Sequence, residues 1–250
     1  EIVMSQKKTI FLAAAAFMLA ATFIATPNAK AGTAPGEGFY TGAFVGYGSG
    51  ILQAEVTSVA INTKPNNGGT FETDRGGLGL NGIQGGGWLG WGMKTADDLY
   101  FGAEISGAGS DEKIELTSSV GIKDDDGVTD ITTASAKRNW VAGGAVRVGY
   151  YVNTDTLFSL TGGVAVSQFD VAIGDDSETY YAGGPQVGAQ VETQLSKIDP
   201  NLSLRMEFVY TDYLTAEING MDGVGSSGNG SDNELTGSDS AGRIGVAYRF

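Results

Sequence analysis

The sequence predicts an all-β protein, an eight-stranded antiparallel transmembrane β-barrel with both termini periplasmic, and three observations lead to this fold class. The final segment, residues 240–250, alternates with a period of two and places Ile244, Val246, Tyr248 and Phe250 on one face. Its other face holds arginine, alanine and glycine, which suits a barrel whose apolar side contacts lipid. The chain also begins with an export signal, and short and long connections alternate between its predicted strands.

The first element is a cleaved secretory signal peptide, expected over residues 1–31, with residues 1–3 lying upstream of the start at Met4. A membrane anchor is the rival interpretation, but a proline and a cleavage site directly follow the apolar run. Removal of the segment leaves one domain, the outer-membrane β-barrel, over residues 32–250. The features of the signal are Lys7 and Lys8, the apolar run Ile10–Ile24, Pro27, and the cleavage-site residues Ala29 and Ala31.

The composition argues against several classes of protein. After Gly32 no run of about 18 apolar residues remains, so any crossing of a membrane must use strands. The 250 residues include 40 glycines and only 5 prolines, which disfavours long helices. Cysteine and histidine are absent, which removes disulfides, thiol chemistry, the commonest general base and the commonest metal ligand. The formal net charge of −14 argues against nucleic acid as a partner.

Eight segments of the mature chain alternate between apolar and polar residues, and eight is the smallest common number of strands in a membrane barrel. The segments begin near Phe39, Gly77, Leu99, Arg138, Thr156, Thr179, Asn201 and Asp239. Their connections alternate strictly between short and long, as a barrel with both termini at one rim requires. The short connections are predicted at 93–98, 152–155 and 196–200, and the long ones at 55–76, 107–137, 170–178 and 215–238.

Most strands offer one apolar face, and the face of Phe250 is taken as lipid-facing. The segment after Asn201 is the clearest, because Leu204, Met206 and Phe208 alternate with polar residues. Aromatic residues fall near the predicted strand ends, where rings of this kind form a girdle at the membrane surface. The predicted girdle residues are Phe39, Trp91, Leu99, Tyr100, Phe101, Tyr150, Tyr210, Tyr213 and Phe250.

The second strand has the weakest pattern. Leu78 and Leu80 are out of phase with Ile83 and Trp91, which lie further along the same segment. A β-bulge or a late strand start near residues 81–82 is therefore predicted.

Strand motifs at the two ends of the domain carry a resemblance to a known family. Residues 39–47, Phe-Tyr-Thr-Gly-Ala-Phe-Val-Gly-Tyr, resemble the first strand of the OmpA-type transmembrane barrel, and residues 202–213 are similar to a seventh strand of the small outer-membrane barrel superfamily. The terminal Tyr-Arg-Phe completes the resemblance, which covers the layout of the mature chain but not its loops. It implies that the barrel assembly machinery reads Ile244, Val246, Tyr248 and Phe250. It also puts Phe44 inside, where the family pattern has a lysine.

Seven charged side chains are predicted to face the barrel interior, three acids and four bases. Two interpretations stay open: an internal salt-bridge network that fills a plugged barrel, or a small water-filled channel lined by the many small inward residues. The seven residues are Glu104, Arg147, Glu192, Arg205, Glu207, Arg243 and Arg249.

Neither catalysis nor a cofactor is expected. The inward carboxylates Glu104 and Glu207 lack a histidine partner and have arginines as their expected partners. Residues 124–130 and 232–234 carry oxygen ligands that calcium prefers, but their spacing does not match an EF-hand loop, so solvated acidic loops are predicted and no metal site. The Gly/Ser-rich residues 223–230 are expected to be flexible.

The sequence therefore predicts a protein of the cell outer membrane with a structural or surface-interaction role, through envelope integrity, loop-mediated contact or adhesion. A small passive porin-like channel is the alternative. The expected partners are outer-membrane lipid or lipopolysaccharide, the barrel assembly machinery, and a host or surface ligand that contacts the acidic loops.

Overall fold

The computed structural model describes residues 34–59, 69–72, 78–118, 132–173, 176–217 and 234–250. The predicted signal peptide at 1–31, its cleavage residues Ala29 and Ala31, and the acidic stretches 124–130 and 232–233 lie outside these residues. The described strands are β1 (Gly38–Val59), β2 (Gly69–Glu72), β3 (Leu78–Lys94), β4 (Leu99–Ser118), β5 (Thr132–Asn153), β6 (Thr156–Ile173), β7 (Asp176–Gln194), β8 (Leu202–Glu217) and β9 (Glu234–Arg249).

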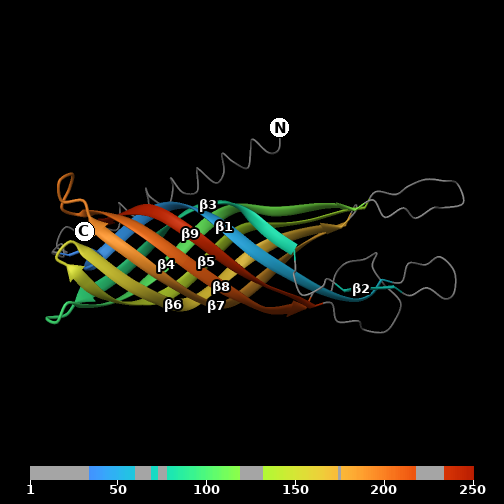
Figure 1. The fold of residues 1–250 in the computed structure, drawn as a ribbon, viewed down its shortest axis with the longest axis horizontal. Helices are drawn as coiled ribbons and strands as arrows, with labels where there is room; N and C mark the ends of the chain where they lie inside the picture. Colours follow the sequence, from blue (N-terminus) through green and yellow to red (C-terminus); the bar gives the residue numbers. More distant parts are fainter. Residues whose placement is uncertain (1–33, 60–68, 73–77, 119–131, 174–175, 218–233) are drawn as a thin grey trace, which may run out of the picture.

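Eight of these strands form one closed antiparallel barrel, as the sequence predicts (Figure 1). The order around the wall is β1-β3-β4-β5-β6-β7-β8-β9, and β9 pairs back onto β1 from Tyr40↔Arg249 to Glu55↔Glu234. The amide of Phe250 donates to the carbonyl of Phe39 at 3.0 Å and extends this closure to the last residue. The short β2 pairs only with β1, outside the closed wall.

The two ends of the barrel differ in their connections. The C-terminus and three short turns lie at one end, called the terminal end; the other, where β1, β4, β6 and β8 finish, is called the loop end (Figure 1). Side chains bond to the backbone in each short turn: Thr95 Oγ1 accepts from the amide of Leu99, Asn153 Oδ1 from that of Asp155, and Asp199 Oδ1 from that of Asn201. Such local bonds favour tight turns over continued strand.

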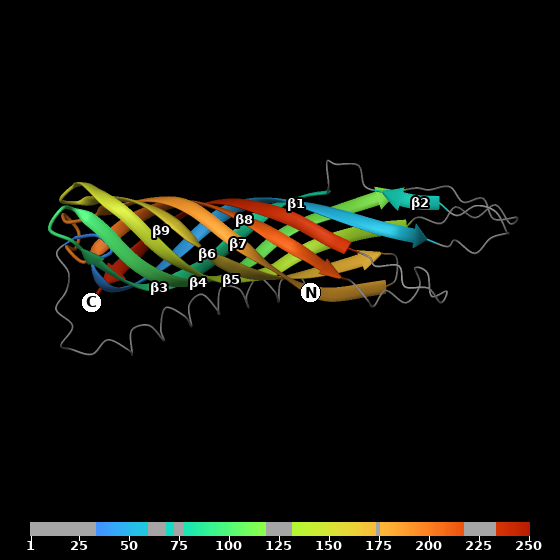
Figure 2. The same ribbon diagram turned by 90° about the horizontal axis from the view of Figure 1, so that it is seen from below.

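The strands reach further toward the loop end than the sequence pattern indicates (Figure 2). The long connection predicted at 107–137 is mostly strand, because β4 continues to Ser118 and β5 starts at Thr132. β7 and β9 likewise begin before Thr179 and Asp239, and β2 was not predicted. The predicted boundaries are wrong here because the backbone hydrogen bonds of an antiparallel pair continue through polar residues that show no apolar alternation.

The predicted bulge near residues 81–82 is also wrong. The β1–β3 register runs unbroken from Gly38↔Gly92 to Leu52↔Leu78. Leu80 points into the barrel and is buried. Its phase differs from that of Ile83 because part of the interior at this height is apolar: Leu80 packs there in a cluster with Ala136, Phe169, Tyr180, Ala182 and Tyr213.

Two register shifts, on β4 and β5, alter which side chains face the interior near the loop end. The β4–β5 ladder shifts between Gly109 and Glu112, and the β5–β6 ladder shifts between Arg138 and Trp140. Against β6, the β5 strand carries the extra residue, Asn139. A bulge of this kind reverses the side-chain phase of the strand beyond it.

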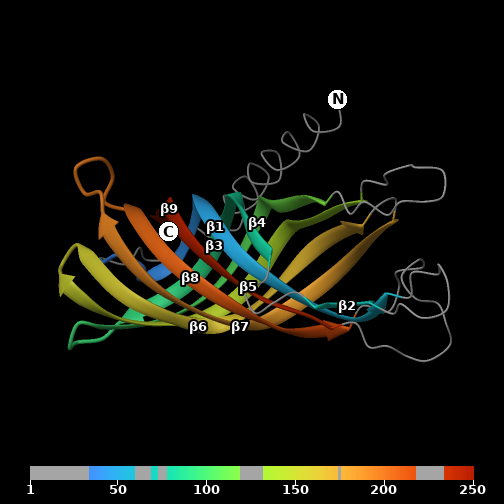
Figure 3. The same ribbon diagram turned by 45° about the vertical axis from the view of Figure 1, so that its right-hand side comes forward.

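The outer surface of the barrel is apolar, and the strands that form it run obliquely to the long axis (Figure 3). Most of the predicted girdle residues are outward and exposed, but Tyr100 and Tyr213 are buried inside, which corrects their assignment. Tyr100 lies on the same inward face of β4 as Glu104, and Tyr213 lies on the same inward face of β8 as Val209. No helix in the described part of the chain has the length and hydropathy to span a membrane.

The charged barrel interior as candidate functional site

Glu104, Arg147, Glu192 and Arg205 form a buried set, called the central network. Arg205 donates to both carboxylate oxygens of Glu104, at 2.7 and 2.8 Å to Oε2 and 3.0 Å to Oε1. β8 and β4, which carry these two residues, are four positions apart in the eight-stranded wall. This ion pair therefore crosses the full width of the lumen.

Arg147 on β5 joins the network to a third wall of the barrel. It donates to Glu192 at 3.1 Å and lies 3.5 Å from Glu104 Oε2. Its Nη1 also donates to the hydroxyl of Tyr40 at 2.8 Å, and that hydroxyl donates to Glu104 at 2.9 Å. Each carboxylate is thus held by several donors, the condition under which buried charges are tolerated.

Neutral polar side chains complete the central network. Ser203 donates to Glu192 at 2.7 Å, and Arg205 donates to the amide oxygen of Gln190 at 2.5 Å. The amide nitrogen of Gln190 donates in turn to Glu207 at 2.9 Å, and Glu207 lies 3.8 Å from Arg243. The network thus connects six of the seven predicted inward charges.

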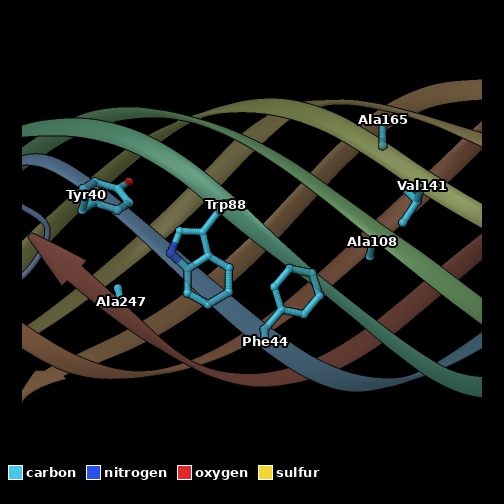
Figure 4. Packing of buried hydrophobic residues seen from close by; sticks show 7 residues of the cluster. All are labelled: Tyr40, Phe44, Trp88, Ala108, Val141, Ala165 and Ala247. Carbon is cyan, nitrogen blue, oxygen red and sulfur yellow. The ribbon is translucent and has the colours of Figure 1, made fainter. Parts of the chain in front are cut away.

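Aromatic rings fill the space beside the guanidinium groups. Phe44 and Trp88 stack at 5.2 Å between ring centroids with planes 9° apart (Figure 4). The guanidinium of Arg205 lies 4.4 Å from the Trp88 ring, and that of Arg243 lies 4.7 Å from the Phe44 ring. Phe44 therefore occupies the interior position that the family resemblance gives to a lysine, and it contacts a cation there.

A second ionic group lies nearer the loop end and was missed by the sequence analysis. Arg138 donates to Asp239 at 2.5 Å, to Glu112 by a short hydrogen bond, and to the hydroxyl of Tyr213 at 3.3 Å. Tyr213 is hydrogen-bonded to Ser167 at 2.7 Å. We call Glu112, Arg138, Tyr213 and Asp239 the loop-end cluster.

The inward position of two members of this cluster could have been predicted from the alternation of their strands. Glu112 lies eight residues after Glu104 on β4, and Asp239 lies four residues before Arg243 on β9, so both keep the inward phase of their strands. Arg138 lies nine residues before Arg147, which faces inward. Because side chains alternate along a strand, this odd spacing predicts that Arg138 faces outward. The bulge at Asn139 turns it inward, and nothing in the sequence marked that bulge.

The seventh predicted charge, Arg249, lies at the terminal end. It donates to the carbonyls of Ala34 and Pro200. The segment Ala34–Glu37, called the strap, lies against this end, with the Tyr151 hydroxyl donating to Pro35 at 2.7 Å and the Tyr100 hydroxyl to Gly36 at 3.1 Å. Gly36 has φ +76°, a conformation that side-chain-bearing residues rarely adopt.

The described interior therefore holds five carboxylates and five arginines, and its formal charge is zero. A cavity of about 10 Å³ lies beside the loop-end cluster, against Leu80, Phe169 and Asp239. A volume of this size holds about one water molecule. Within the described ranges no group of three or more histidine, cysteine or acidic side chains is placed to hold a metal ion.

No protein-family model matches the sequence, and no curated protein is significantly similar to it. Solved structures with a similar fold include neisserial surface protein A, at 12% identity and TM-score 0.46 over 86% of this chain and 98% of that one. OprG from Pseudomonas aeruginosa is 12% identical with TM-score 0.48, over 86% and 97% of the two chains. The outer membrane protease OmpT from Escherichia coli is 10% identical with TM-score 0.49, over 90% and 100%.

All three TM-scores are below 0.5, so nothing about the activity of this chain follows from these likenesses. The class of protein is defined by its own geometry. A closed antiparallel wall leaves no sheet edge inside a bilayer, the outer surface is apolar, and the charges are paired within. The described residues form an eight-stranded β-barrel of the outer-membrane type.

Proposed function

We propose that this protein is a plugged outer-membrane barrel with a structural and surface-contact role, in envelope integrity, loop-mediated contact or adhesion. The observation that carries the proposal is the ion pair between Arg205 and Glu104, which bridges opposite walls of the lumen. An eight-stranded barrel is just wide enough for side chains to fill, and here guanidinium groups and the Phe44–Trp88 stack occupy its centre. Solute would have to break buried ion pairs to pass.

The proposed location in the outer membrane and the proposed partners are supported by the outward face of β9 and by the sequence. The outward apolar face of β9 supports recognition of Ile244, Val246, Tyr248 and Phe250 by the barrel assembly machinery. The predicted signal peptide at 1–31 supports export to the outer membrane, and the stretches that the sequence predicts as acidic loops are the proposed contact for a host or environmental ligand. We propose no enzymatic activity and no nucleic-acid partner.

The small passive channel is the competing function, and the interior argues against it. The cavity beside the loop-end cluster has a volume of about 10 Å³, which is room for about one water molecule. Side chains of other strands fill the space beside small inward residues: a Cβ atom at Gly42 would meet Trp88, and one at Gly48 would meet Glu112.

Planar-bilayer conductance of the purified, folded protein tests the proposal. A heat-dependent shift in gel mobility first verifies that the barrel is closed. The double variant Glu104→Ala/Arg205→Ala keeps the interior charge balanced and removes the pair that bridges the lumen, so it serves as the opened control. We expect no conductance steps from the wild type and steps from this variant. Discrete, reproducible steps from the folded wild type would move the protein to the channel class.

A further inference from the structure

Two acidic side chains of the loop-end cluster are bonded to the same arginine. Arg138 donates from Nη2 to Oε1 of Glu112 and from Nη1 to Oδ2 of Asp239. The other carboxylate oxygen of Asp239, Oδ1, is buried and has no hydrogen-bond partner among the described residues. With both acids ionised, the loop-end cluster carries a formal charge of −1, whereas the charges of the central network balance.

Glycines on β1 and β3 leave the space in which the two carboxyl groups meet. A Cβ atom at Gly48 would overlap Oε1 of Glu112, and a Cβ atom at Gly82 would lie 2.7 Å from the Cα atom of Glu112. A Cβ atom at Gly50 would lie 3.4 Å from Oδ1 of Asp239. With these positions free of side chains, the carboxyl groups of Glu112 and Asp239 come within hydrogen-bond reach of each other.

Two buried carboxyl groups in contact are stable when they hold one proton between them, because two ionised groups repel and a carboxylate can only accept hydrogen bonds. A proton on Glu112 gives the carboxylate of Asp239 a second donor beside Arg138 and brings the formal charge of the loop-end cluster to zero. The outward neighbours of Glu112 on β4 are the exposed residues Asp111 and Lys113, so the pair lies beyond the membrane-spanning part of the strand. Burial raises the pKa of the Glu112 carboxyl to about 7, against the opposing effect of Arg138.

The groups around the acid pair do not themselves change charge near neutral pH. Among the described residues, the charged and titratable groups that face the pair are Arg138 of β5, Tyr213 of β8 and Arg243 of β9. Arginine and tyrosine stay protonated throughout the neutral range. The other strands contribute the glycines of β1 and β3 and the side chains of Leu80, Phe169 and Tyr180.

We propose that Glu112 and Asp239 share one proton and form a pH-sensitive clasp between β4 and β9 at the loop end of the barrel. The two strands are three positions apart around the closed wall, so the clasp acts across the lumen. Loss of the proton leaves two carboxylates in contact with a single arginine between them and weakens the connection between the two walls. The clasp concerns the stability of the loop end and is independent of the surface-contact role proposed above.

The pH dependence of unfolding tests the clasp. An acid that keeps its proton to a higher pH in the folded state than in the unfolded state stabilises the fold at low pH, and this stability is lost as the pH rises. The chain contains no histidine, so no other side chain with an ordinary pKa titrates between about pH 5.5 and pH 7. In urea unfolding from lipid vesicles over this range, the unfolding equilibrium constant of the wild type should rise by up to about tenfold per pH unit.

Amide variants assign the proton to the pair. Glu112→Gln and Asp239→Asn each replace one acid by a neutral group of the same shape that can still donate to the remaining carboxylate. In each variant the unfolding equilibrium constant should stay within about threefold over the same pH range. Asp111→Asn is the matched control, because it removes one acid from the adjacent outward position of β4 and should keep the pH dependence of the wild type. The heat-dependent shift in gel mobility verifies that each variant forms a closed barrel.

Two results would overturn the proposal. A wild-type unfolding equilibrium constant that does not rise over this pH range would show that the folded barrel holds no more protons than the unfolded chain, and this measurement needs no variant. An undiminished pH dependence in a folded Glu112→Gln or Asp239→Asn barrel would assign the proton to another group. Loss of the pH dependence in both variants, with its retention in Asp111→Asn, is the result expected of the clasp.

Discussion

Arg138 on β5 donates a hydrogen bond of 2.5 Å to Asp239 on β9, four strands away around the closed wall. Together with the pair of Arg205 and Glu104, this contact gives the lumen two ion pairs that bridge opposite walls at different heights. At the terminal end, the strap forms a third set of contacts inside the barrel, through the hydrogen bonds of Tyr100 and Tyr151 to its carbonyls. The barrel is therefore braced from within along most of its length.

Replacing Glu104 by Gln should destabilise the barrel by about 3–5 kcal/mol, because Arg147 and Arg205 would keep buried charges that have lost their shared partner. Equilibrium unfolding in urea from lipid vesicles measures the loss. Asp97→Asn, in an exposed turn at the terminal end, is the matched control and should change the free energy of unfolding by less than about 0.5 kcal/mol. A loss from Glu104→Gln no larger than that of the control would show that the central network is not stabilising.

The loop-end cluster should behave as one unit in a double-mutant cycle. Arg138→Met and Asp239→Leu should each cost about 3–5 kcal/mol, since each leaves a charge in the cluster without its partner across the lumen. The double variant should cost less than the sum by about 1–3 kcal/mol. Additive losses in the same unfolding experiment would mean that the two residues do not interact.

Gly42→Ala should destabilise the barrel by about 1–3 kcal/mol, because a Cβ atom there would lie 2.5 Å from Nε1 of Trp88 and 2.6 Å from the carbonyl of Val246. Unfolding monitored by tryptophan fluorescence reports both the stability and the displaced ring. Gly162→Ala is the control, since a Cβ at that position meets nothing within 4 Å. A similar loss in the two variants would exclude the contact with Trp88 as the cause.

Tyr151→Phe should loosen the strap by about 1 kcal/mol, because it removes the hydrogen bond to the carbonyl of Pro35 and leaves the ring in place. Amide hydrogen exchange of residues 36–37 should accelerate about fivefold while β1 stays protected. The neighbouring Tyr150 faces outward and is 51% exposed, so Tyr150→Phe is the matched control. Unchanged exchange in Tyr151→Phe would mean that this bond does not hold the strap.

The inward charges show where the alternation of residues predicts the face of a side chain correctly and where it does not. Glu104, Glu192, Arg205 and Glu207 lie in regular strands, where a period of two is enough to assign the face. Arg138 could not be assigned in this way, because one extra residue at position 139 reverses the phase and leaves no compositional mark.

Leu80 illustrates the opposite error. Its apolar side chain was expected to face lipid, so its phase was explained by a bulge that does not exist. Inside the barrel it packs in an apolar cluster beside the charged residues, with Phe169 stacked on Tyr180 at 5.2 Å. Alternation tells which residues share a face, but not whether the inside is polar at a given height.

By itself the sequence determined the fold class, the number of strands in the closed wall and the outward face of most strands, because alternation is a local property that each strand carries in its own residues. Only the tertiary structure decided which charges meet. Glu104 and Arg205 are 101 residues apart in the chain and share an ion pair because closure of the barrel places β4 opposite β8. A pairing of this kind depends on the order of all strands around the wall, which no single segment encodes.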